Sequence, residues 1–135
     1  MEYIVKTYKL RVRIHVEQHA PLWMFSLTKA WSDKIERFQK TALYIILGKH
    51  AHREYSRNLA TLNLKPLEQR RLTIAKRFAA KILKHPEHRK IFNIVKPNTR
   101  SGNRIEVPKC RTKRYKKSTV PALANIINRE LKDKI

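Results

Sequence analysis

Apolar residues recur at helical spacing along most of the chain, and prolines and glycines mark the ends of the segments that carry them. This pattern predicts helices over residues 28–47, 52–62, 66–84 and 121–132. The first can be capped by Thr28 and ended by Gly48, and the third begins at Pro66, a residue suited to the first helical position. We therefore predict a mostly α fold: a small helical bundle followed by a basic, loop-rich segment and a C-terminal helix.

The predicted helices are amphipathic, and their apolar faces define the expected core. In the helix over 28–47 this face consists of Trp31, Ile35, Phe38, Ala42, Ile45 and Ile46. In the C-terminal helix it consists of Leu123, Ile126, Ile127 and Leu131. We accordingly expect Trp31, like Trp23, to pack in the core rather than to stack on a nucleic-acid base.

The first 20 residues fit two structures. Side chains from Tyr8 to Val16 alternate strictly between apolar and polar, which is typical of a half-buried strand. The same stretch places Tyr8, Val12 and Val16 four residues apart, on one face of a helix. Pro21 is expected to end the element, because proline disfavours helical geometry at the preceding residue, Ala20. Local propensity favours the strand, but the pattern alone leaves both structures open.

The predicted helix over 66–84 has an apolar and a basic side. Its apolar centre is formed by Leu67, Ile74, Phe78 and Ile82. The other side carries, within an arc of about 120°, Arg70, Lys76, Arg77, Lys81 and Lys84. No acid interrupts this arc, whereas a purely solvated face usually mixes both signs of charge. Its length of about 21 Å suits a run of several phosphates, so we predict a contact with nucleic acid.

The net charge of the chain supports this prediction. Its 135 residues include 32 lysines and arginines against 10 acids, and the formal net charge of +22 opposes compaction unless a polyanion neutralises part of it. Residues 96–117 concentrate nine basic residues and a single acid, Glu106. We expect a flexible clamp on nucleic acid formed by Arg100, Arg104, Lys109, Arg111, Lys113, Arg114, Tyr115, Lys116 and Lys117. Tyr115 offers a stacking ring among phosphate-binding charges, and the same residues would satisfy a nuclear import signal.

These features predict a partner and a compartment. RNA, DNA or an RNA–DNA hybrid is the expected partner, and an anionic membrane surface is the lesser alternative. The apolar run over 42–47 is far shorter than the roughly 20 residues that cross a bilayer. The single cysteine, Cys110, excludes an intrachain disulfide and fits a reducing, intracellular compartment, which the import signal narrows to the nucleus. We divide the chain into a helical, thumb-like domain (1–95), a flexible basic region (96–117) and a C-terminal helix (118–135).

Neither a catalytic nor a metal site is expected. The two aspartates, Asp33 and Asp133, are far apart, whereas two-metal phosphoryl transfer needs acids clustered around ions roughly 4 Å apart. Two glycines are too few for a glycine-rich phosphate loop. A zinc site would have to gather loop histidines around a lone cysteine, which is not the ligand spacing of structural zinc. We predict no enzymatic activity, no cofactor and no metal.

Three blocks of sequence, in a fixed order, resemble one family. The first comprises Tyr8-Lys9, Val12-Arg13, Val16-Glu17 and Ala20-Pro21-Leu22-Trp23. The second comprises Leu27-Thr28 and Ile35-Glu36-Arg37-Phe38-Gln39-Lys40-Thr41-Ala42-Leu43-Tyr44-Ile45-Ile46-Leu47-Gly48. The third comprises Leu59-Ala60-Thr61-Leu62-Asn63-Leu64, Pro66-Leu67-Glu68-x-Arg70-Arg71, Phe78-Ala79, His85-Pro86, Asn98-Thr99-Arg100-Ser101 and Cys110-Arg111-Thr112-x-Arg114-Tyr115. Together they are similar to the C-terminal part of the open reading frame of Jockey-like non-LTR retrotransposons, just downstream of the reverse transcriptase palm.

The resemblance implies the thumb and C-terminal extension of a reverse transcriptase. In that family the stretch corresponding to 8–16 is a thumb helix, so we expect a helix there. A thumb packs against the product duplex and would hold template RNA and nascent DNA by their phosphates, largely without sequence readout. This sequence contains neither the Tyr-x-Asp-Asp palm motif nor the fingers, so the resemblance implies binding without catalysis. The alternative is an independent, small, basic nucleic-acid-binding or scaffold protein derived from such an element.

Overall fold

The computed structural model describes residues 1–90, 92, 94–95 and 104–132, and of residues 89, 94, 95, 104 and 130–132 the backbone only. The prediction of a mostly helical protein with a C-terminal helix is confirmed. The chain forms two compact units. Unit 1 consists of Met1–Ala20 and Leu27–Leu72, and unit 2 of Pro21–Ser26 and Thr73–Ile135. The division falls inside a helix, α6 (Leu67–Lys84), whereas the predicted domains meet at residue 95.

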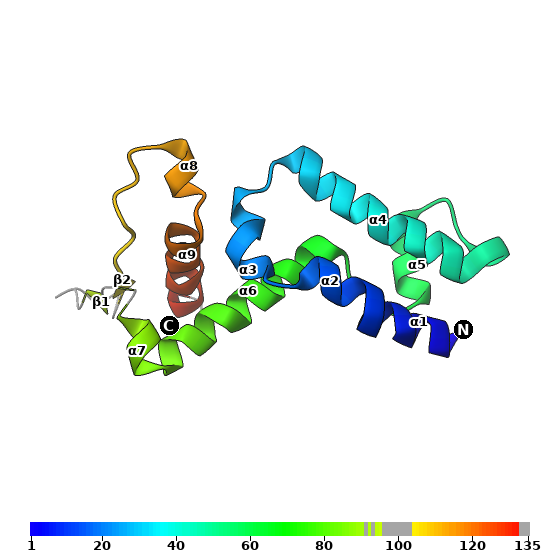
Figure 1. The fold of residues 1–135 in the computed structure, drawn as a ribbon, viewed down its shortest axis with the longest axis horizontal. Coiled ribbons are helices and arrows are strands. Elements are labelled where there is room, and N and C mark those ends of the chain that lie inside the picture. Colours follow the sequence, from blue (N-terminus) through cyan, green and yellow to red (C-terminus); the bar gives the residue numbers. More distant parts are fainter. Residues whose placement is uncertain (91, 93, 96–103, 133–135) are drawn as a thin grey trace. The chain divides into compact units, whose positions relative to one another are not determined.

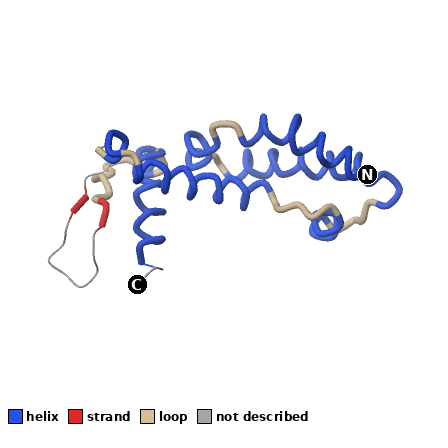
Figure 2. Tube along the Cα trace, turned by 90° about the horizontal axis from the view of Figure 1, so that it is seen from below, coloured by secondary structure: helices blue, strands red, loops and turns tan. Residues whose placement is uncertain are grey.

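Unit 1 is built on two helical segments that lie side by side and run in opposite directions (Figure 1, Figure 2). The first consists of α1 (Glu2–Thr7), a π-helical turn (Tyr8–Val12) and α2 (Arg13–Glu17), and the second is α4 (Lys29–Leu47). Both pack against α5 (Tyr55–Thr61) and the loop that follows it. Their shared core contains Val5, Tyr8, Leu43, Leu47, Leu59, Leu62 and Leu64.

The stretch over residues 8–16 is helical, as the resemblance implies, and the strand favoured by local propensity is wrong. Its first part winds as a wider π-helical turn, a form that is rare outside single turns. Tyr8 lies on the inner side of this turn, is 4 % exposed, and donates a hydrogen bond to Gln39 in α4. Tertiary packing of Tyr8 and its neighbours thus overrides the alternating pattern.

The N-terminal helical segment ends earlier than Pro21 predicts. Glu17 is the last residue of α2; Gln18 is extended, and His19 has φ +53°, in the left-handed region. Pro21 lies instead in the first turn of the short helix α3 (Ala20–Trp23), where its missing N–H costs no helical hydrogen bond. The break in the N-terminal helical segment is therefore at residues 18 and 19.

Helix α4 has the predicted ends but only part of the predicted buried face, since Ala42 and Ile46 are partly buried against the core of unit 1. The Thr28 hydroxyl accepts a hydrogen bond from the Trp31 backbone N–H at 3.4 Å, and Gly48, with φ +53°, follows the last helical residue. The fully buried side chains of α4 are Gln39, Leu43 and Leu47. Trp31, Phe38 and Ile45 are instead 57 %, 49 % and 77 % exposed, so their assignment to the core is wrong.

The loop before α5 explains why this helix is shorter than predicted. The buried side chain of Asn58 accepts a hydrogen bond from the His52 backbone N–H and donates one to the His52 carbonyl, each at 2.8 Å. These bonds hold residue 52 outside the helix, which begins at Tyr55 rather than at 52. Asn63, with φ +49°, lies just past the end of α5, as the sequence predicts.

Unit 2 is organised around the second half of α6 and the C-terminal helix, α9 (Thr119–Lys132). Between them in the chain lie α7 (Pro86–Arg89), the antiparallel strands β1 (Ile94–Val95) and β2 (Arg104–Ile105), and α8 (Lys113–Lys116). The two short strands stand out in red in Figure 2. The core of unit 2 contains Ala75, Ala79, Ile82, Phe92, Ile105, Leu123, Ala124 and Ile127.

Two side-chain contacts fasten α9 to the rest of unit 2. Asn128 accepts a hydrogen bond from the Ile105 backbone N–H and donates one to the Ile105 carbonyl, both at 2.9 Å, so its amide completes the pairing of β2 as a further strand would. The Thr119 hydroxyl donates to the Leu22 carbonyl at 2.8 Å. These contacts hold the segment between β2 and α9 at its first end, through Ile105, and at its last end, through Thr119. Among the described residues, no helix combines the length and apolar character needed to span a bilayer.

Candidate nucleic-acid interface

Helix α6 brings four of its five predicted basic residues together on an exposed surface. Its apolar side is buried at Leu67, Ala75, Ala79 and Ile82. The exposed side carries the α6 stripe, which we define as Lys76, Arg77, Lys81 and Lys84. All four belong to the unit 2 part of the helix and span about 12 Å at about 1.5 Å per residue. The stripe is therefore a short line of exposed positive charge.

Arg70, the fifth predicted residue, is held in an ion pair within unit 1. Its Nε donates to Glu17 Oε1 at 2.5 Å, and its terminal nitrogen donates to Glu17 Oε2 at 2.8 Å. The hydrogen bond that Arg70 donates to Glu17 raises the pKa of Arg70. Arg13 Nε lies 3.3 Å from the same carboxylate, and burial, followed by the nearby charge of Arg70, lowers the pKa of Arg13. A bidentate pair of this kind fixes Arg70 to the N-terminal helical segment rather than presenting it to a phosphate.

Because Arg70 is held in an ion pair and Arg77 is exposed, we expect opposite effects when each of these two arginines of α6 is replaced. Arg70→Gln removes the bidentate bonds to Glu17, so unit 1 should lose about 1.5 kcal/mol of unfolding free energy while the salt dependence of nucleic-acid binding stays unchanged. Arg77→Gln, on the exposed side of the same helix, should leave stability within about 0.5 kcal/mol and lower the salt slope by about 0.9. Urea denaturation and fluorescence anisotropy across a salt series measure both. A lower salt slope with unchanged stability for Arg70→Gln would show instead that Arg70 contacts the nucleic acid.

A hydrogen-bond network inside unit 1 determines where α6 begins. Glu36 in α4 accepts hydrogen bonds from the Leu67 backbone N–H at 3.1 Å and from the Tyr55 hydroxyl at 2.5 Å. The Leu67 N–H is one of the donors that a helix N-terminus leaves unsatisfied, so the carboxylate of one helix caps another. The pKa of Tyr55 is raised, first by burial and then by its hydrogen bond to Glu36.

Gln39 lies at the centre of the same network. It is fully buried, accepts from the Tyr8 hydroxyl at 3.0 Å, and donates to the Tyr55 hydroxyl at 2.9 Å and to the Lys65 carbonyl at 3.1 Å. Burial raises the pKa of Tyr8 to about 12. The sequence analysis did not single out Gln39 or Glu36, because their partners lie 16 to 31 residues away.

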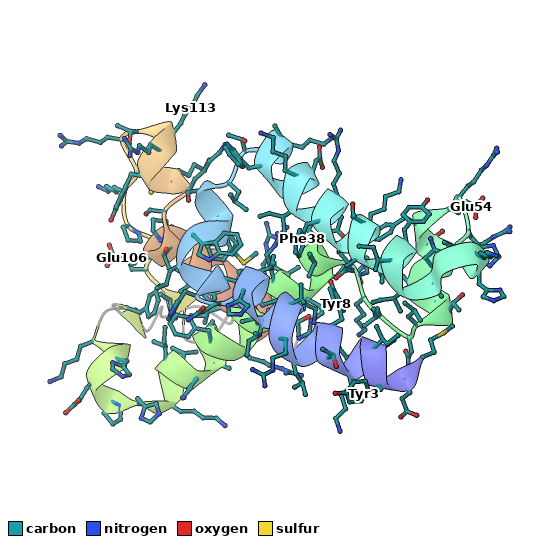
Figure 3. All side chains as sticks on the ribbon, turned by 45° about the vertical axis from the view of Figure 1, so that its right-hand side comes forward. Tyr3, Tyr8, Phe38, Glu54, Glu106 and Lys113 are labelled. Atoms are coloured by element: carbon teal, nitrogen blue, oxygen red, sulfur yellow. The ribbon has the colours of Figure 1, made fainter. Side chains whose placement is uncertain are left out.

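The second group of exposed cations follows β2. We define the basic segment as residues 109–117; its exposed charged and aromatic side chains are Lys109, Arg111, Lys113, Arg114, Tyr115, Lys116 and Lys117. Residues 107–129 contain no acid. Tyr115 is 44 % exposed, and Lys113 extends outward from α8 (Figure 3). Of the other predicted clamp residues, Arg100 lies outside the described residues, and Arg104 belongs to β2 but its side chain is not described.

The backbone of the basic segment contains one helical turn that the sequence analysis missed. Thr112 caps α8 by accepting a hydrogen bond from the Tyr115 backbone N–H at 3.2 Å, and the Ser118 backbone N–H bonds the Tyr115 carbonyl at 2.9 Å. A threonine three residues before the bonded N–H is the usual mark of a helix start, and it was available in the sequence. The cap orders the cations around Tyr115 before any ligand binds.

The histidines and the single cysteine are the remaining side chains that could carry chemistry, and the sequence predicts no metal site among them. Within the described ranges, no three His, Cys, Asp or Glu side chains gather in a way that could hold a metal ion. His85 and His88 face each other edge to face, with ring centroids 5.7 Å apart. The thiol of Cys110 donates to the Pro108 carbonyl at 3.1 Å.

Fold and surface together define a class: a small, helical, strongly basic chain that displays cations along one helix and one loop. No protein-family model, no curated protein and no solved structure matches this chain. Its function is therefore inferred from the exposed cations and the contacts that support them.

Proposed function

We propose that the chain binds nucleic acid through its phosphates, using the basic segment and the α6 stripe. The observation that carries this proposal is the basic segment: six exposed cations and one exposed ring, without an acid among them, on a backbone held by β2 and α9. Each lysine or arginine that neutralises a phosphate releases condensed counterions, which is the main source of affinity in sequence-independent binding. Because the backbone that carries these cations is already ordered, little conformational entropy is lost when they bind phosphates and release counterions.

The resemblance over residues 8–131 makes the proposal more specific. As the thumb and C-terminal extension of a non-LTR reverse transcriptase, the chain would hold the template–primer duplex while a separate palm carries out DNA synthesis. The helical fold and the phosphate-directed surface support this role, since a thumb recognises duplex shape rather than base sequence. In this role the chain binds nucleic acid in the nucleus and catalyses nothing itself.

An independent basic nucleic-acid-binding or scaffold protein is the second candidate. The observation that favours it is that both units carry their own apolar core, which allows the chain to fold without a palm. Such a protein would bind any polyanion in proportion to its phosphate density, whereas a thumb would prefer the geometry of a hybrid duplex.

Fluorescence anisotropy across a salt series separates the two candidates. The ligands are an RNA–DNA hybrid, duplex DNA and single-stranded RNA of equal length. A preference for the hybrid that persists at moderate salt supports the thumb. Equal and steeply salt-dependent affinity for all three supports the independent basic protein. Absence of salt-dependent binding to any of the three overturns the proposed function altogether.

A further inference from the structure

A row of exposed apolar side chains runs along α4 in unit 1. Trp31, Phe38 and Ile45 are spaced seven residues apart, which places them within about 40° of one another around the helix axis. Two of them are aromatic, and each is about half exposed or more. Single exposed apolar residues are ordinary on protein surfaces, but an aligned row that includes tryptophan and phenylalanine is typical of a binding surface.

The surroundings of this row are positively charged. The Lys34 ammonium nitrogen lies 4.3 Å from the centroid of the Trp31 ring, so the ring face is covered by a flexible cation rather than by core side chains. Of the exposed charges of α4, Lys34 and Arg37 lie on the side next to the row, whereas Lys29, Lys40 and the single exposed acid, Asp33, lie farther around the helix. An apolar row edged by cations complements a ligand that combines flat rings with negative charge.

We propose that this surface binds single-stranded nucleic acid, with bases stacked on Trp31 and Phe38 and phosphates bound by Lys34 and Arg37. The inference rests on the proposed function and deepens it, because it names unpaired nucleotides as a ligand class. Every base has a π face, and that face is accessible only outside a duplex. The two rings are about 10.5 Å apart along the helix axis, a distance that a single strand covers within a few nucleotides.

The fold holds both rings in place before a ligand arrives. The opposite side of α4 is locked into unit 1 by Gln39, Leu43 and Leu47, so the helix cannot rotate to bury Trp31 or Phe38 within its own unit. Rings on a rigid helix lose little conformational freedom when a base stacks on them. Figure 3 shows the position of Phe38 on this helix.

Charge and shape favour single-stranded nucleic acid over a second copy of the chain and over a membrane surface as the ligand of this row. A second copy of a chain with net charge +22 would bring cations of the same sign against Lys34 and Arg37. A membrane surface is bound by helices that insert a broad apolar face, whereas α4 has already buried its broad face in unit 1 and exposes only a narrow row.

Tryptophan fluorescence tests the stacking directly. The chain has two tryptophans, so a Trp23→Phe variant reports on Trp31 alone. Titration with oligouridylate of about 12 nucleotides should quench the emission of Trp31, because a stacked base is in contact with the indole. Salt of about 0.3 M shortens the Debye length to about 6 Å and suppresses purely electrostatic binding. Duplex DNA of equal length should leave the emission unchanged.

A ring-removing variant supplies the affinity test. The double variant Trp31→Leu/Phe38→Leu keeps apolar bulk and helix propensity, and it should bind the single strand at least about tenfold more weakly with an unchanged salt slope. Tyr3→Leu, at an 80 % exposed ring on α1, is the matched control and should bind as the unaltered chain does. Neutralising the basic segment has the reverse signature, a lower slope, so failure of this inference and failure of the proposed function are distinguishable.

Three outcomes would overturn the inference. Unquenched emission together with unchanged affinity of the double variant would show that bases do not stack on Trp31 and Phe38, and it would leave the proposed function intact. A blue-shifted Trp31 emission with phosphatidylserine vesicles, but no response to the oligonucleotide, would assign the row to a membrane surface. Concentration-dependent mass in sedimentation that disappears in the double variant would assign it to a second copy of the chain.

Discussion

Replacing the six cations of the basic segment by glutamine is expected to lower the affinity for duplex nucleic acid about 10³-fold at physiological salt. The substituted residues are Lys109, Arg111, Lys113, Arg114, Lys116 and Lys117. Each lost phosphate contact lowers the slope of log K against log salt by about 0.9, so the slope should fall by about five units if all six bind. Thr112 and Tyr115 are retained, and with them the cap that forms α8. Anisotropy across a salt series measures both quantities.

The control is a variant with the same change in net charge. Six exposed cations elsewhere, Lys6, Arg11, Lys49, Arg53, Lys65 and Lys90, are replaced by glutamine. If local arrangement matters, this variant should keep most of the affinity and most of the slope. Equal losses in the two variants would mean that the chain binds as a diffuse polycation, and the basic segment would have no special role.

The ends of the helices were predictable because they depend on neighbouring residues. Thr28 caps α4 as predicted, and Gly48, the predicted end of the helix, follows its last residue with a positive φ of +53°. A capping hydroxyl acts on an N–H three residues away, and glycine needs no partner to adopt a positive φ. Thr112 is the same kind of signal, and applying the rule consistently would have predicted α8.

Buried faces were less predictable because they depend on distant residues. Helix α4 has apolar residues on two sides, and periodicity alone favours the side with Trp31, Phe38 and Ile45. In the structure Gln39, Leu43 and Leu47 are fully buried, Ala42 and Ile46 only partly, and Gln39 has hydrogen-bond partners 16, 26 and 31 residues away. A buried glutamine is costly unless such partners exist, and the sequence pattern does not reveal them.

The same limit applies to the candidate interface. The helical wheel places Arg70 correctly beside the α6 stripe, but its ion-pair partner Glu17 is 53 residues distant in the chain. Charge patterns therefore identified the exposed cations of unit 2, whereas the role of Arg70 required tertiary structure. Trp31 shows the converse case, since an apolar residue that the pattern assigns to the core is exposed.

Gln39→Leu is expected to destabilise unit 1 by about 3 kcal/mol, although it makes the buried residue more apolar. Three groups lose their hydrogen bond to Gln39 in the variant: the Tyr8 hydroxyl, the Tyr55 hydroxyl and the Lys65 carbonyl. The Tyr55 hydroxyl still donates to Glu36, so the loss falls mainly on the Tyr8 hydroxyl and the Lys65 carbonyl. A buried polar group without a partner costs about 1–3 kcal/mol, and the gain from an extra buried methyl group offsets only part of this.

Urea denaturation followed by circular dichroism and by tryptophan emission measures this loss, in a Trp23→Phe background so that Trp31 alone reports on unit 1. Lys40→Leu, at the adjacent exposed position of α4, is the control and should change the unfolding free energy by no more than about 0.5 kcal/mol. A loss below about 1 kcal/mol in Gln39→Leu would mean that the network is replaceable by apolar packing. A loss of the expected size would instead show that Gln39 selects which side of α4 faces the core, and thereby leaves Trp31 and Phe38 on the outside.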